Sequence, residues 1–462
     1  MGQTVVVGLG RSGQGAARLL NASGKDVTVI DSGQGAELEQ RSHQLQQQGI
    51  AVQLNTPLVF ESFTPWLDQL QQVVISPGIA WDHPTLLQLR EAGVAVDGEM
   101  ALAWDALQHI PWVGITGTNG KTTVTHLLSH VLCASGIQAP MGGNMGVSAA
   151  EMALSLQQPG TAAPDWLVME LSSYQIEAAR RIRPRIGIWT TLTPDHLERH
   201  GTIDAYRAIK RGLIEQADTA ILNADDPDLR QQRPSWAGAV WVSAEGPNPG
   251  GQPADLWIDA SGMVRDREQI LFAAEALAMP GAHNRQNMLL VTAAARAIGV
   301  KPAQIEAALR SFRGVPHRLE PLGRINGAAV FNDSKATNYD AAEVALRAMQ
   351  GPTVVLAGGL TKQGDASGWL EQLSQRACAV VLFGAGGAEL QQLIEGSTFS
   401  GVVMRVEALP AAVDAALQLV DKLGATTVLL SPACASFDQY RDFEARGDHF
   451  RTLIETVQDQ SS

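Results

Sequence analysis

The sequence predicts an α/β protein of three domains, each with a largely parallel sheet flanked by helices. Its 462 residues correspond to about three domains of roughly 150 residues each. Short β-branched runs alternate with helix-like segments along the chain, a pattern typical of parallel strands connected by helices. Two of these runs lead directly into glycine-rich loops, at Gly8 and at Gly117, which indicates that the strand and helix pattern begins again partway along the chain.

The composition excludes several classes of protein. Hydrophobic residues make up 45% of the chain and charged residues 18%, with a mean hydropathy of -0.02, so we expect a soluble globular protein without membrane insertion. The net charge of -13 argues against a broad electrostatic grip on nucleic acid. Three scattered cysteines are too few for a disulfide framework, and no secretory leader is evident, so we expect a cytoplasmic location.

The first domain, expected over residues 1–98, begins with a strand, a glycine loop and a helix. The run Thr4–Val7 is β-branched and apolar, the segment Gly8–Gly13 interrupts it, and a helix-like segment follows at Ala16–Leu20. Further strands are expected at Asp26–Ile30 and at Val73–Ile75.

The same loop leaves one alternative function open. Gly8, Gly10 and Gly13 fit the GxGxxG fingerprint of dinucleotide-binding folds, and Asp31 lies 18 residues beyond Gly13, close to the roughly 20 expected for a ribose-binding acid. A nicotinamide-dependent oxidoreductase is therefore an alternative. A single fingerprint is a weak signal, however, and it does not explain the second glycine loop.

That second loop, Gly117–Thr123, has the sequence GTNGKTT and is the strongest local signal. It follows the apolar run Trp112–Thr116 and precedes the apolar helix Val124–Leu132, as a phosphate-binding loop requires. Its backbone N–H groups can hold phosphate oxygens, Lys121 can neutralise them and the hydroxyl of Thr122 can bind Mg²⁺. Ile115 stands where the strict motif has glycine. A phosphate-loop ATPase or kinase without ligase activity is a second alternative.

The remaining elements complete a central domain over residues 99–314 and a third domain over residues 315–462. The segment Gly246–Asp255 is rich in Pro and Gly and is expected to be an exposed loop. Helices are expected at His283–Ala297 and Gln304–Phe312. The expected strands are Trp166–Glu170, Ile186–Thr191, Ala220–Asn223, Ala328–Phe331, Thr353–Ala357, Ala379–Phe383 and Thr427–Leu430.

Two polar segments follow strands of the central domain. Glu170–Gln175 places a carboxylate at the carboxyl end of a strand, where ligands of α/β proteins bind. Asp195–His200 adds imidazoles and further carboxylates. Taken alone, each of these side chains could equally be structural or solvated.

Together these segments resemble the ATP-dependent Mur ligases. The resemblance rests on GTNGKTT, on ELSSYQ at 170–175, on PDHLERH at 194–200, on YRAIK at 206–210, on NADD at 223–226 and on GAHN at 281–284. In the third domain, PHRLE at 316–320, NDSKATN at 332–338 and SPACASFDQY at 431–440 resemble the D-glutamate-adding members of that family.

The resemblance implies a Rossmann-like first domain, a P-loop ATPase-like central domain and a Rossmann-like third domain. It implies a monomeric cytoplasmic ligase that adds D-glutamate to UDP-N-acetylmuramoyl-L-alanine in peptidoglycan precursor synthesis. ATP would be cleaved to ADP through an acyl-phosphate intermediate. The implied cofactors are ATP, two Mg²⁺ ions and a carbamate on Lys210, a residue that on sequence alone would be assigned to the surface.

The resemblance also implies roles for single residues. The catalytic residues would be Lys121, Glu170, His196 and Lys210. Mg²⁺ would be held by Thr122, Glu170, His196 and the carbamate of Lys210. ATP would be bound by Gly117, Thr118, Asn119, Gly120, Lys121, Thr122, Thr123, Asn284, Asn287, Arg318 and Asp333. The UDP-sugar would contact Ser12, Asp31, Ser32, Ser76, Gly78, Asn144, Ser172 and Gln175. The incoming amino acid would contact Lys335, Thr337, Lys362, Ser436, Phe437 and Phe443.

The chain departs from the family pattern at two places. Thr191 stands where many relatives have Asn, ahead of the Asp195-His196 pair. The interval from His196 to Lys210 is slightly shorter than in relatives. Both departures concern the geometry around the expected metal-binding histidine.

Overall fold

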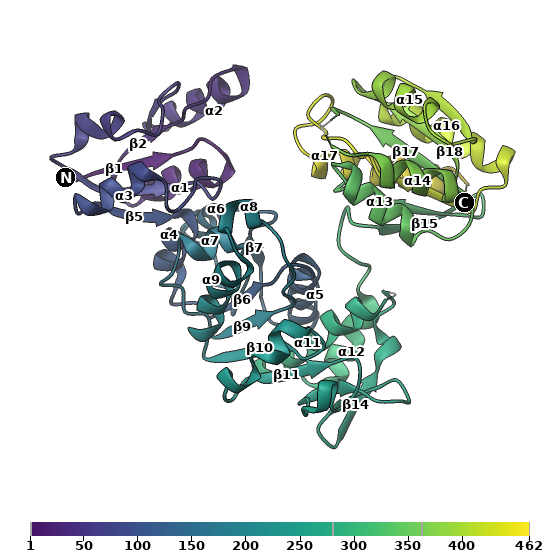
Figure 1. Cartoon of the computed structure of the whole chain (residues 1–462), viewed down its shortest axis with the longest axis horizontal. Helices are drawn as coiled ribbons and strands as arrows, with labels where there is room; N and C mark the ends of the chain where they lie inside the picture. Colours follow the sequence, from purple (N-terminus) through teal and green to yellow (C-terminus); the bar gives the residue numbers. More distant parts are fainter. Residues whose placement is uncertain (1, 280, 362–363, 462) are drawn as a thin grey trace. The chain divides into compact units, whose positions relative to one another are not determined.

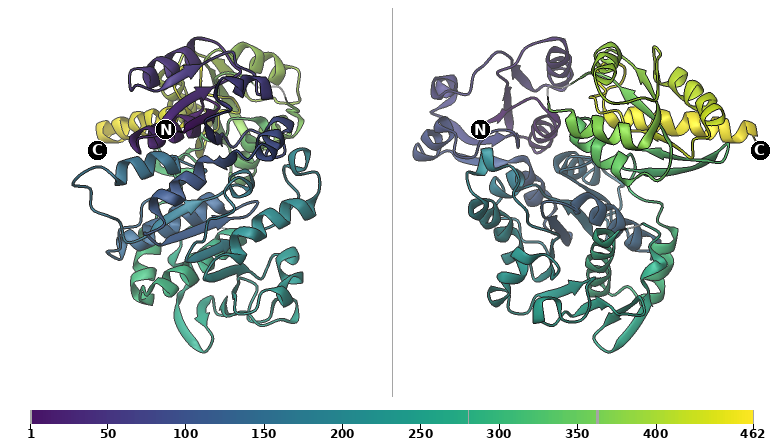
Figure 2. Two further views of the ribbon diagram at one scale, coloured as in Figure 1. Left: turned by 90° about the vertical axis from the view of Figure 1, so that its left-hand side faces the viewer. Right: turned by 45° about the vertical axis from the view of Figure 1, so that its right-hand side comes forward.

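The computed structural model describes residues 2–279, 281–361 and 364–461, and over these residues the chain forms three β-sheets with helices packed against them (Figures 1 and 2). The expected α/β class is confirmed. The described residues divide into two compact units, Met1–Phe312 and Arg313–Ser462, and the first unit carries two of the sheets. The expected domain boundaries after residues 98 and 314 stay predictions.

The first sheet has the strand order β3-β2-β1-β4-β5, and all of its strands are parallel. β1 lies in the middle, so the loops that follow β1, β2 and β4 meet at one edge, a position where open α/β sheets bind ligands. The strands are β1 (Gln3–Val7), β2 (Asp26–Ile30), β3 (Ala51–Gln53), β4 (Leu70–Ile75) and β5 (Ala95–Gly98). The helices are α1 (Arg11–Ala22), α2 (Ala36–Gln46), α3 (Pro84–Glu91) and α4 (Glu99–Leu107), with a 3₁₀ segment at Phe60–Trp66.

The second sheet has the order β14-β13-β12-β11-β10-β9-β6-β8-β7. It is parallel from β7 through β12, and β13 and β14 extend it as antiparallel strands. The strands are β6 (Trp112–Thr116), β7 (Met141–Gly143), β8 (Leu167–Glu170), β9 (Ile186–Trp189), β10 (Thr219–Asn223), β11 (Val240–Ser243), β12 (Leu256–Ile258), β13 (Met263–Asp266) and β14 (Gln269–Ala273).

The register of this sheet places the functional segments together. β6 pairs with both β8 and β9, with Ile115 opposite Glu170 and Thr116 opposite Trp189. The loops after these strands therefore leave the sheet at the same edge. The helices of this part are α5 (Lys121–Ala134), α6 (Ala149–Leu156), α7 (Ser173–Glu177), α8 (Leu197–His200), α9 (Ile203–Glu215), α10 (Pro227–Gln231), α11 (Ala282–Ile298) and α12 (Pro302–Ser311).

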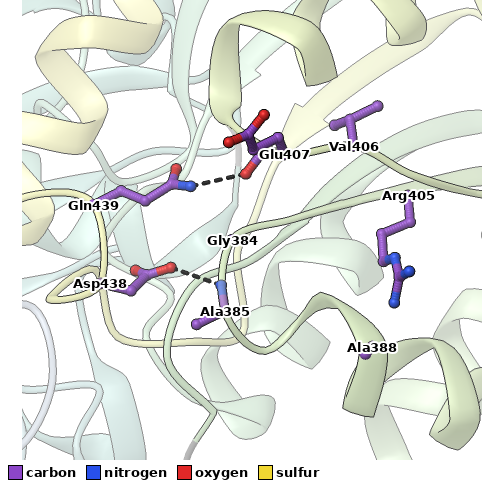
Figure 3. A pocket seen from close by; sticks show the side chains of 8 residues that line it. All are labelled: Gly384, Ala385, Ala388, Arg405, Val406, Glu407, Asp438 and Gln439. Carbon is purple, nitrogen blue, oxygen red and sulfur yellow. Dashed lines mark hydrogen bonds between the residues drawn. The ribbon is translucent and has the colours of Figure 1, made fainter.

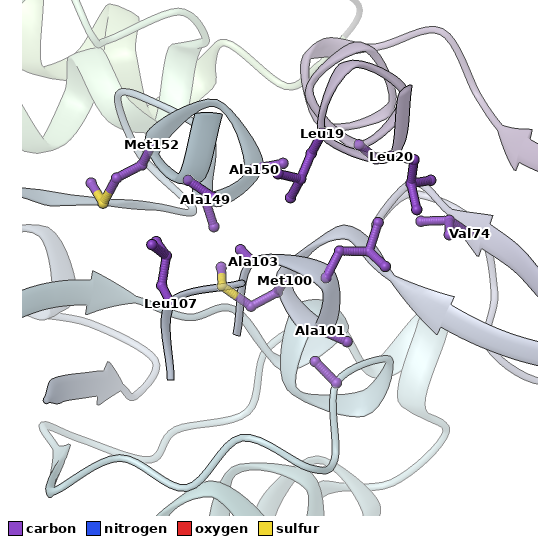
Figure 4. Packing of buried hydrophobic residues seen from close by; sticks show 14 of the residues in the cluster. Leu19, Leu20, Val74, Met100, Ala101, Ala103, Leu107, Ala149, Ala150 and Met152 are labelled. Atoms are coloured by element: carbon purple, nitrogen blue, oxygen red, sulfur yellow. The ribbon is translucent and has the colours of Figure 1, made fainter. Parts of the chain in front are cut away.

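Helices α1, α4 and α6 pack against one another and join the two sheets of the first unit (Figure 4). Leu19 of α1, Met100 of α4 and Ala150 of α6 belong to one buried cluster that also includes side chains of β4 and β8. Small side chains on α4 and α6 allow the close approach of these helices. The two sheets of this unit therefore share a continuous hydrophobic core.

The sheet of the second unit has the order β15-β16-β20-β17-β18-β19, with β15 antiparallel to its neighbour. Alternate side chains pack on its two faces: Val354 and Leu356 lie in the cluster with α16 and α17, whereas Val355 lies with α13 and α14. The strands are β15 (Glu320–Ile325), β16 (Ala328–Asn332), β17 (Thr353–Gly358), β18 (Ala377–Phe383), β19 (Val402–Arg405) and β20 (Thr427–Leu430). The helices are α13 (Tyr339–Ala348), α14 (Ser367–Arg376), α15 (Gly387–Glu395), α16 (Leu409–Leu423) and α17 (Phe443–Ser461).

Two expected elements need correction. The expected strand Ile186–Thr191 ends at Trp189, because Thr190 and Thr191 turn to hold the loop after β6. The segment Gly246–Asp255 is not wholly exposed: it contains a 3₁₀ turn, and Pro249 and Ala254 are buried. Within the described residues, no helix combines the length and apolarity that a bilayer span requires.

The glycine loop after β1 provides a stability prediction. A side chain on Gly13 would place its Cβ 1.8 Å from the carbonyl oxygen of Gly8, whereas a Cβ on Gly10 would have nothing within 4 Å. We expect Gly13→Ala to destabilise the fold by about 2 kcal/mol or more, because backbone must move, and Gly10→Ala to change it by about 0.5 kcal/mol or less. Urea unfolding measures both variants. Equal stability of the two would contradict the clash.

Candidate active site

The loop after β1 is tied to the loop after β2 by Asp31. One carboxylate oxygen accepts the backbone N–H of Leu9 at 2.6 Å, and the other accepts that of Gly33 at 2.7 Å. Ser76, after β4, donates to the carbonyl of Gly8 at 3.4 Å. Asp31 and Ser76 thus lie at one edge of the sheet, as expected. Of the other expected positions, Ser12 lies in the first turn of α1, and Ser32 and Gly78 lie in the loops after β2 and β4.

The loop after β6 is shaped for an anion. Gly117 and Gly120 have φ angles of +146° and +85°, a conformation that favours glycine. A Cβ on Gly117 would lie 1.9 Å from Oγ1 of Thr190, so only glycine allows the loop to lie against the end of β9. Helix α5 begins at Lys121 with Thr122 and Thr123 buried in its first turn. The start of α5 presents backbone N–H groups of the kind that bind phosphate.

Thr191 holds the loop after β6 in place. Its hydroxyl oxygen accepts the backbone N–H of Asn119 at 3.0 Å, and its carbonyl accepts that of Thr118 at 2.8 Å. The hydroxyl of Thr118 donates to the carbonyl of Thr193 at 3.0 Å. The departure from the family pattern at position 191 therefore keeps a hydrogen-bonding side chain beside the phosphate loop.

Glu170, at the end of β8, is 1% exposed and carries an unsatisfied oxygen. Asn144 donates its side-chain N–H to Oε1 at 2.9 Å and its backbone N–H to the Glu170 carbonyl at 2.9 Å. Oε2 is buried and has no hydrogen-bond partner among the described residues. A buried carboxylate oxygen without a partner is costly, and a hard cation such as Mg²⁺ would satisfy it.

The protein's own acids and histidines do not complete a cation site. Over the described ranges, no group of three or more His, Cys, Asp or Glu side chains is placed to hold a metal ion. The donor set at Glu170 therefore fits a metal whose remaining ligands come from hydroxyl, phosphate or carbamate oxygens.

Lys210 on α9 is 1% exposed, so its assignment to the surface from sequence alone is wrong. Its Nζ donates to the carbonyl of Gly117 at 2.9 Å and lies 3.4 Å from Oγ1 of Thr116. Lys121 donates to the same Gly117 carbonyl at 2.9 Å. Burial, and secondly the charge of Lys121, lower the pKa of Lys210 well below its ordinary value. The charged form of Lys210 is therefore disfavoured relative to that of an exposed lysine.

The two histidines of the segment 194–200 differ in environment. His200 is buried, exchanges a hydrogen bond of 2.9 Å with Ser173 and stacks on Tyr174, and burial lowers its pKa. His196 has a φ of +53°, and its side chain is 45% exposed, which leaves its ring open to a ligand. No hydrogen bond or ion pair joins His196 to Glu170 in the part of the chain that is described. The ring nitrogens of His196 instead lie 3.5 and 3.7 Å from carboxylate oxygens of Asp195 and Glu198.

Asn284 and Asn287 lie on α11 beside the phosphate loop. Both are buried, and Nδ2 of Asn287 donates to Oδ1 of Asn284 at 3.4 Å. A Cβ on Gly120 would lie 2.6 Å from Oδ1 of Asn287. Both amides are thus close to where a nucleotide would extend from the loop. Ser172 and Gln175, expected to contact substrate, form a capping box at the start of α7.

In the second unit, Asp333 follows β16 and is held on both sides. Its carboxylate accepts the backbone N–H of Leu319 at 3.1 Å and the hydroxyl of Ser431 at 3.1 Å. Burial raises the pKa of Asp333 to about 7, against the opposing effect of these hydrogen bonds and of the charges on Arg318 and Lys335. The exposed Arg318 and the half-buried Lys335 thus lie in the electrostatic field of Asp333.

The residues expected around the incoming amino acid lie in loops at the carboxyl edge of this sheet and at the start of α17. Ser436 is buried, Thr337 is half-buried, and Nζ of Lys335 is 5.7 Å from the ring centre of Phe443. Phe437 is 66% exposed. Lys362 lies outside the described residues.

Arg446 was not expected and connects these loops. It is fully buried on α17 and donates to the carbonyls of Ser334 at 2.8 Å, Cys434 at 3.1 Å and Gly358 at 3.3 Å. Burial lowers its pKa to about 10. The sequence carries a weak signal for it, because Arg446 takes a place in the apolar face formed by Phe443 and Phe450 at helical spacing.

A pocket of about 400 Å³ opens beside this region, at the carboxyl ends of β18 and β19 (Figure 3). Asp438 accepts the backbone N–H of Ala385 at 2.9 Å, and Gln439 donates to the carbonyl of Glu407 at 2.8 Å. Asp438 and Gln439 belong to the same SFDQ segment as Ser436. None of the expected site residues lines this pocket. Its lining is Gly384, Ala385, Ala388, Arg405, Val406, Glu407, Asp438 and Gln439.

Comparison with family models finds three matches along the chain. Residues 2–98 match the model described as Mur ligase MurD-like, N-terminal domain. Residues 115–295 match the Mur ligase middle domain, and residues 317–434 match the Mur ligase, glutamate ligase domain.

The chain is also similar to curated proteins over its full length. It is 75% identical to the UDP-N-acetylmuramoylalanine–D-glutamate ligase of Parasynechococcus marenigrum strain WH8102, over 99% of each chain. It is 64% identical to the protein of the same name from Synechococcus sp. strain CC9605, over 100% of each chain.

Solved structures share the fold. The UDP-N-acetylmuramate–alanine ligase of Thermotoga maritima superposes with a TM-score of 0.57 at 21% identity, covering 100% of both chains. A pseudomurein peptide ligase type C from Methanothermus fervidus has a TM-score of 0.52 at 19% identity and covers 99% of this chain and 100% of its own.

Asp333 predicts a pH dependence of stability. Because burial raises the pKa of Asp333 from its ordinary value of 3.8 to about 7, the folded state holds a proton that the unfolded state loses, and stability falls as pH rises between these values. The difference in free energy of unfolding between Asp333→Asn and wild type should shift in favour of the variant by on the order of 3 kcal/mol from about pH 4 to about pH 8. Urea unfolding across this range measures it, with Asp340→Asn, at an exposed position of α13, as control. A pH-independent difference would contradict the raised pKa.

Proposed function

The chain belongs to the Mur ligase family, and on that premise we propose that it joins D-glutamate to UDP-N-acetylmuramoyl-L-alanine while ATP is cleaved to ADP and phosphate. This is the activity named for relatives that are 75% and 64% identical over essentially the whole chain. The observation that carries the proposal is the meeting of a phosphate loop, buried Glu170 and buried Lys210 at one sheet edge.

Activation of the substrate carboxylate explains why ATP is needed. A carboxylate oxygen is a poor leaving group, so the carboxylate first attacks the terminal phosphorus of ATP, which forms an acyl phosphate and releases ADP. The amine of D-glutamate then attacks the acyl carbon, loses a proton and expels inorganic phosphate. Lys121 and the N–H groups at the start of α5 would stabilise the charge on the transferring phosphoryl group.

The nucleotide would extend from this loop toward α11. The buried amides of Asn284 and Asn287 can both donate and accept, which suits an adenine ring. Thr122, Glu170, His196 and Lys210 would hold Mg²⁺, and the bound ions would screen the negative charges of ATP and of the substrate carboxylate. The unsatisfied Oε2 of Glu170 supports this assignment.

Lys210 would act in this site as a carbamate. Its amine would attack CO₂ to form an N-carboxylate with loss of one proton, a reaction that requires the neutral amine. The lowered pKa of Lys210 supplies that form, and the neighbouring Lys121 would stabilise the anionic product. The carbamate would add a negatively charged oxygen donor to the metal ligands.

The UDP group would bind at the edge of the first sheet, where Asp31 and Ser76 meet the glycine loop and Ser12, Ser32 and Gly78 lie nearby. This role for the fingerprint replaces that of a nicotinamide site, because the family model for this domain is a Mur ligase domain. A phosphate-loop kinase is likewise not favoured, since the similarity extends over all parts of the chain.

The amino acid would be bound by the second unit. D-glutamate brings two carboxylates, and Lys335, Thr337, Lys362 and Ser436 would supply donors for them, while Phe437 and Phe443 would contact its carbon chain. Arg318 and Asp333 would contact ATP. The three cysteines are free thiols, which fits a reducing cytoplasm, and we propose that the enzyme acts there as a monomer.

A competition assay tests the reaction. Purified protein with ATP, Mg²⁺ and UDP-N-acetylmuramoyl-L-alanine should use D-glutamate at least about 100-fold better than L-glutamate, D-alanine or meso-diaminopimelate. D-alanine leaves the donors for the second carboxylate without a partner, L-glutamate with both carboxylates bound directs its amine differently, and meso-diaminopimelate brings an additional charged amine. Hydroxylamine should trap an acyl group when the amino acid is omitted. Lys121→Ala should lower turnover on the order of 10³-fold, and Lys25→Ala, on the surface, should not. Faster use of another amino acid would overturn the choice of D-glutamate.

The carbamate is tested by isotopic labelling. We expect ¹³C-bicarbonate to give one carbamate carbon resonance in wild-type protein that is lost in Lys210→Arg, because the guanidinium remains protonated and does not react with CO₂. A short carboxylic acid should partly restore the activity of Lys210→Ala. Lys25→Ala is the control and should keep the resonance. Full activity in CO₂-free buffer, with no labelled resonance, would refute the modification.

A further inference from the structure

Glu99 is a buried carboxylate that the proposed chemistry does not use. It is the first residue of α4, directly after β5, and is 2% exposed. Its Oε1 accepts the backbone N–H of Ala150 at 2.5 Å. Burial raises the pKa of Glu99 to about 7, although the Ala150 N–H and the Ser148 side chain favour its ionised form.

The N–H that Glu99 accepts belongs to the first turn of α6. Ser148 caps this helix from within, since its Oγ accepts the backbone N–H of Glu151 at 3.3 Å. Glu99 satisfies a second N–H from a different helix, and its negative charge complements the dipole of α6. Ala149 and Ala150 are fully buried, and in Figure 4 Ala149 lies on the side of Met100 of α4 and Ala150 on the side of Leu19 of α1. The start of α6 is thus fixed to α4.

The turn before α6 reaches the centre of the candidate site. Gly143 donates its N–H to the carbonyl of Val147 at 3.0 Å, which closes the turn. Asn144, inside it, donates to Glu170 through both its backbone and its side chain. A Cβ on Gly143 would lie 2.3 Å from the carbonyl oxygen of Glu170, so the two strands approach closely here. Movement of the start of α6 would therefore move Asn144 relative to Glu170.

Two further contacts join α1 to the turn before α6 and to α6 itself. Arg11, the first residue of α1, donates to the carbonyl of Gly146 at 2.9 Å. Arg18 of α1 pairs with Glu151 at 2.6 Å, with both side chains about one-third exposed. Solvent-exposed pairs contribute little energy. Compared with these two contacts, the hydrogen bond from the Ala150 N–H to Glu99 is buried and does not compete with water.

Stability alone does not explain a carboxylate at this position. A buried acid loses its hydration, and an apolar side chain of similar size could fill the same space between α4 and α6 without that cost. Unlike an apolar side chain, the Glu99 carboxylate accepts the Ala150 N–H and so fixes the position of α6 along α4.

We propose that Glu99 is a positioning residue for the sugar-nucleotide substrate: by capping α6 from α4 it fixes the turn before α6 and holds Asn144 against Glu170. The inference rests on the proposed function, in which Asn144 contacts UDP-N-acetylmuramoyl-L-alanine. Glu99 itself does not touch the reacting atoms. It acts through the backbone of α6.

Steady-state kinetics of single variants gives the first test. Glu99→Ala should raise KM for UDP-N-acetylmuramoyl-L-alanine about 10-fold and leave KM for ATP within about 2-fold, because only the turn is displaced. Glu99→Gln keeps an acceptor oxygen and should stay within about 3-fold of wild type. Asp105→Ala is the matched control, since this carboxylate on α4 pairs with Arg181 and does not contact α6. An unchanged KM for the UDP substrate in Glu99→Ala overturns the proposal.

A double-mutant cycle tests the route through Asn144. In the Asn144→Ala background, Glu99→Ala should change KM for the UDP substrate by less than about 2-fold, whereas independent effects would multiply. If the fold-changes in KM of the two single variants multiply in the double variant, the proposal is overturned. If Glu99→Ala does not fold, Ser148→Ala removes the other cap of α6 and should raise the same KM about 3-fold without affecting KM for ATP. Failure of Ser148→Ala to do so also overturns it.

Calorimetry of UDP-N-acetylmuramoyl-L-alanine separates this inference from the proposed reaction. If wild-type protein binds the compound but does not ligate D-glutamate, the proposed function fails, and the weaker binding expected for Glu99→Ala still tests the role of Glu99. If wild-type protein does not bind the compound, both proposals are refuted.

Discussion

Two lysines share one carbonyl oxygen at the centre of this protein, and the site is organised around that arrangement. Nζ of Lys121 and Nζ of Lys210 each lie 2.9 Å from the carbonyl of Gly117. Two ammonium ions in a buried space repel each other, which contributes to the lowered pKa of Lys210. Gly117 can present its carbonyl in this way because it has no side chain and lies against Thr190. The site therefore combines an anion-binding loop with a buried lysine whose pKa is lowered by burial and by the neighbouring charge of Lys121.

The parallel sheet brings the remaining groups to these lysines. β6 lies between β8 and β9, so the phosphate loop, Glu170 and the segment 190–193 leave the sheet at one edge. Thr191 then fixes the loop by hydrogen bonds, and Asn144 fixes one oxygen of Glu170 while the other stays unsatisfied. These contacts thus leave one oxygen of Glu170 without a hydrogen-bond partner among the described residues, at the same sheet edge as the buried amine of Lys210.

Local sequence patterns were sufficient to predict the fold class and both glycine loops. The strands Asp26–Ile30, Trp112–Thr116 and Thr427–Leu430 have the expected bounds, because β-branched apolar runs end at clear turn residues. The roles expected for single site residues came from the family resemblance and stay predictions. The burial of individual side chains depends on tertiary contacts, which local sequence patterns do not reveal. His196 and His200 lie in the same short sequence segment, yet of the two only His200 is buried. The helical spacing of Arg446 with Phe443 and Phe450 is a weak signal of burial, and only the structure shows the loop carbonyls to which it donates.

The position of Arg446 in the chain affects how the protein is made. A ribosome releases the loops at Ser334, Gly358 and Cys434 before α17, and the guanidinium that joins their carbonyls arrives with that last helix. Until then these carbonyls lack their buried donor, although backbone hydrogen bonds between Leu360 and Ala435 already join the segments at Gly358 and Cys434. The three loops therefore gain their common side-chain contact only after α17 has been synthesised, whereas the phosphate loop lies in the unit that precedes them in the chain.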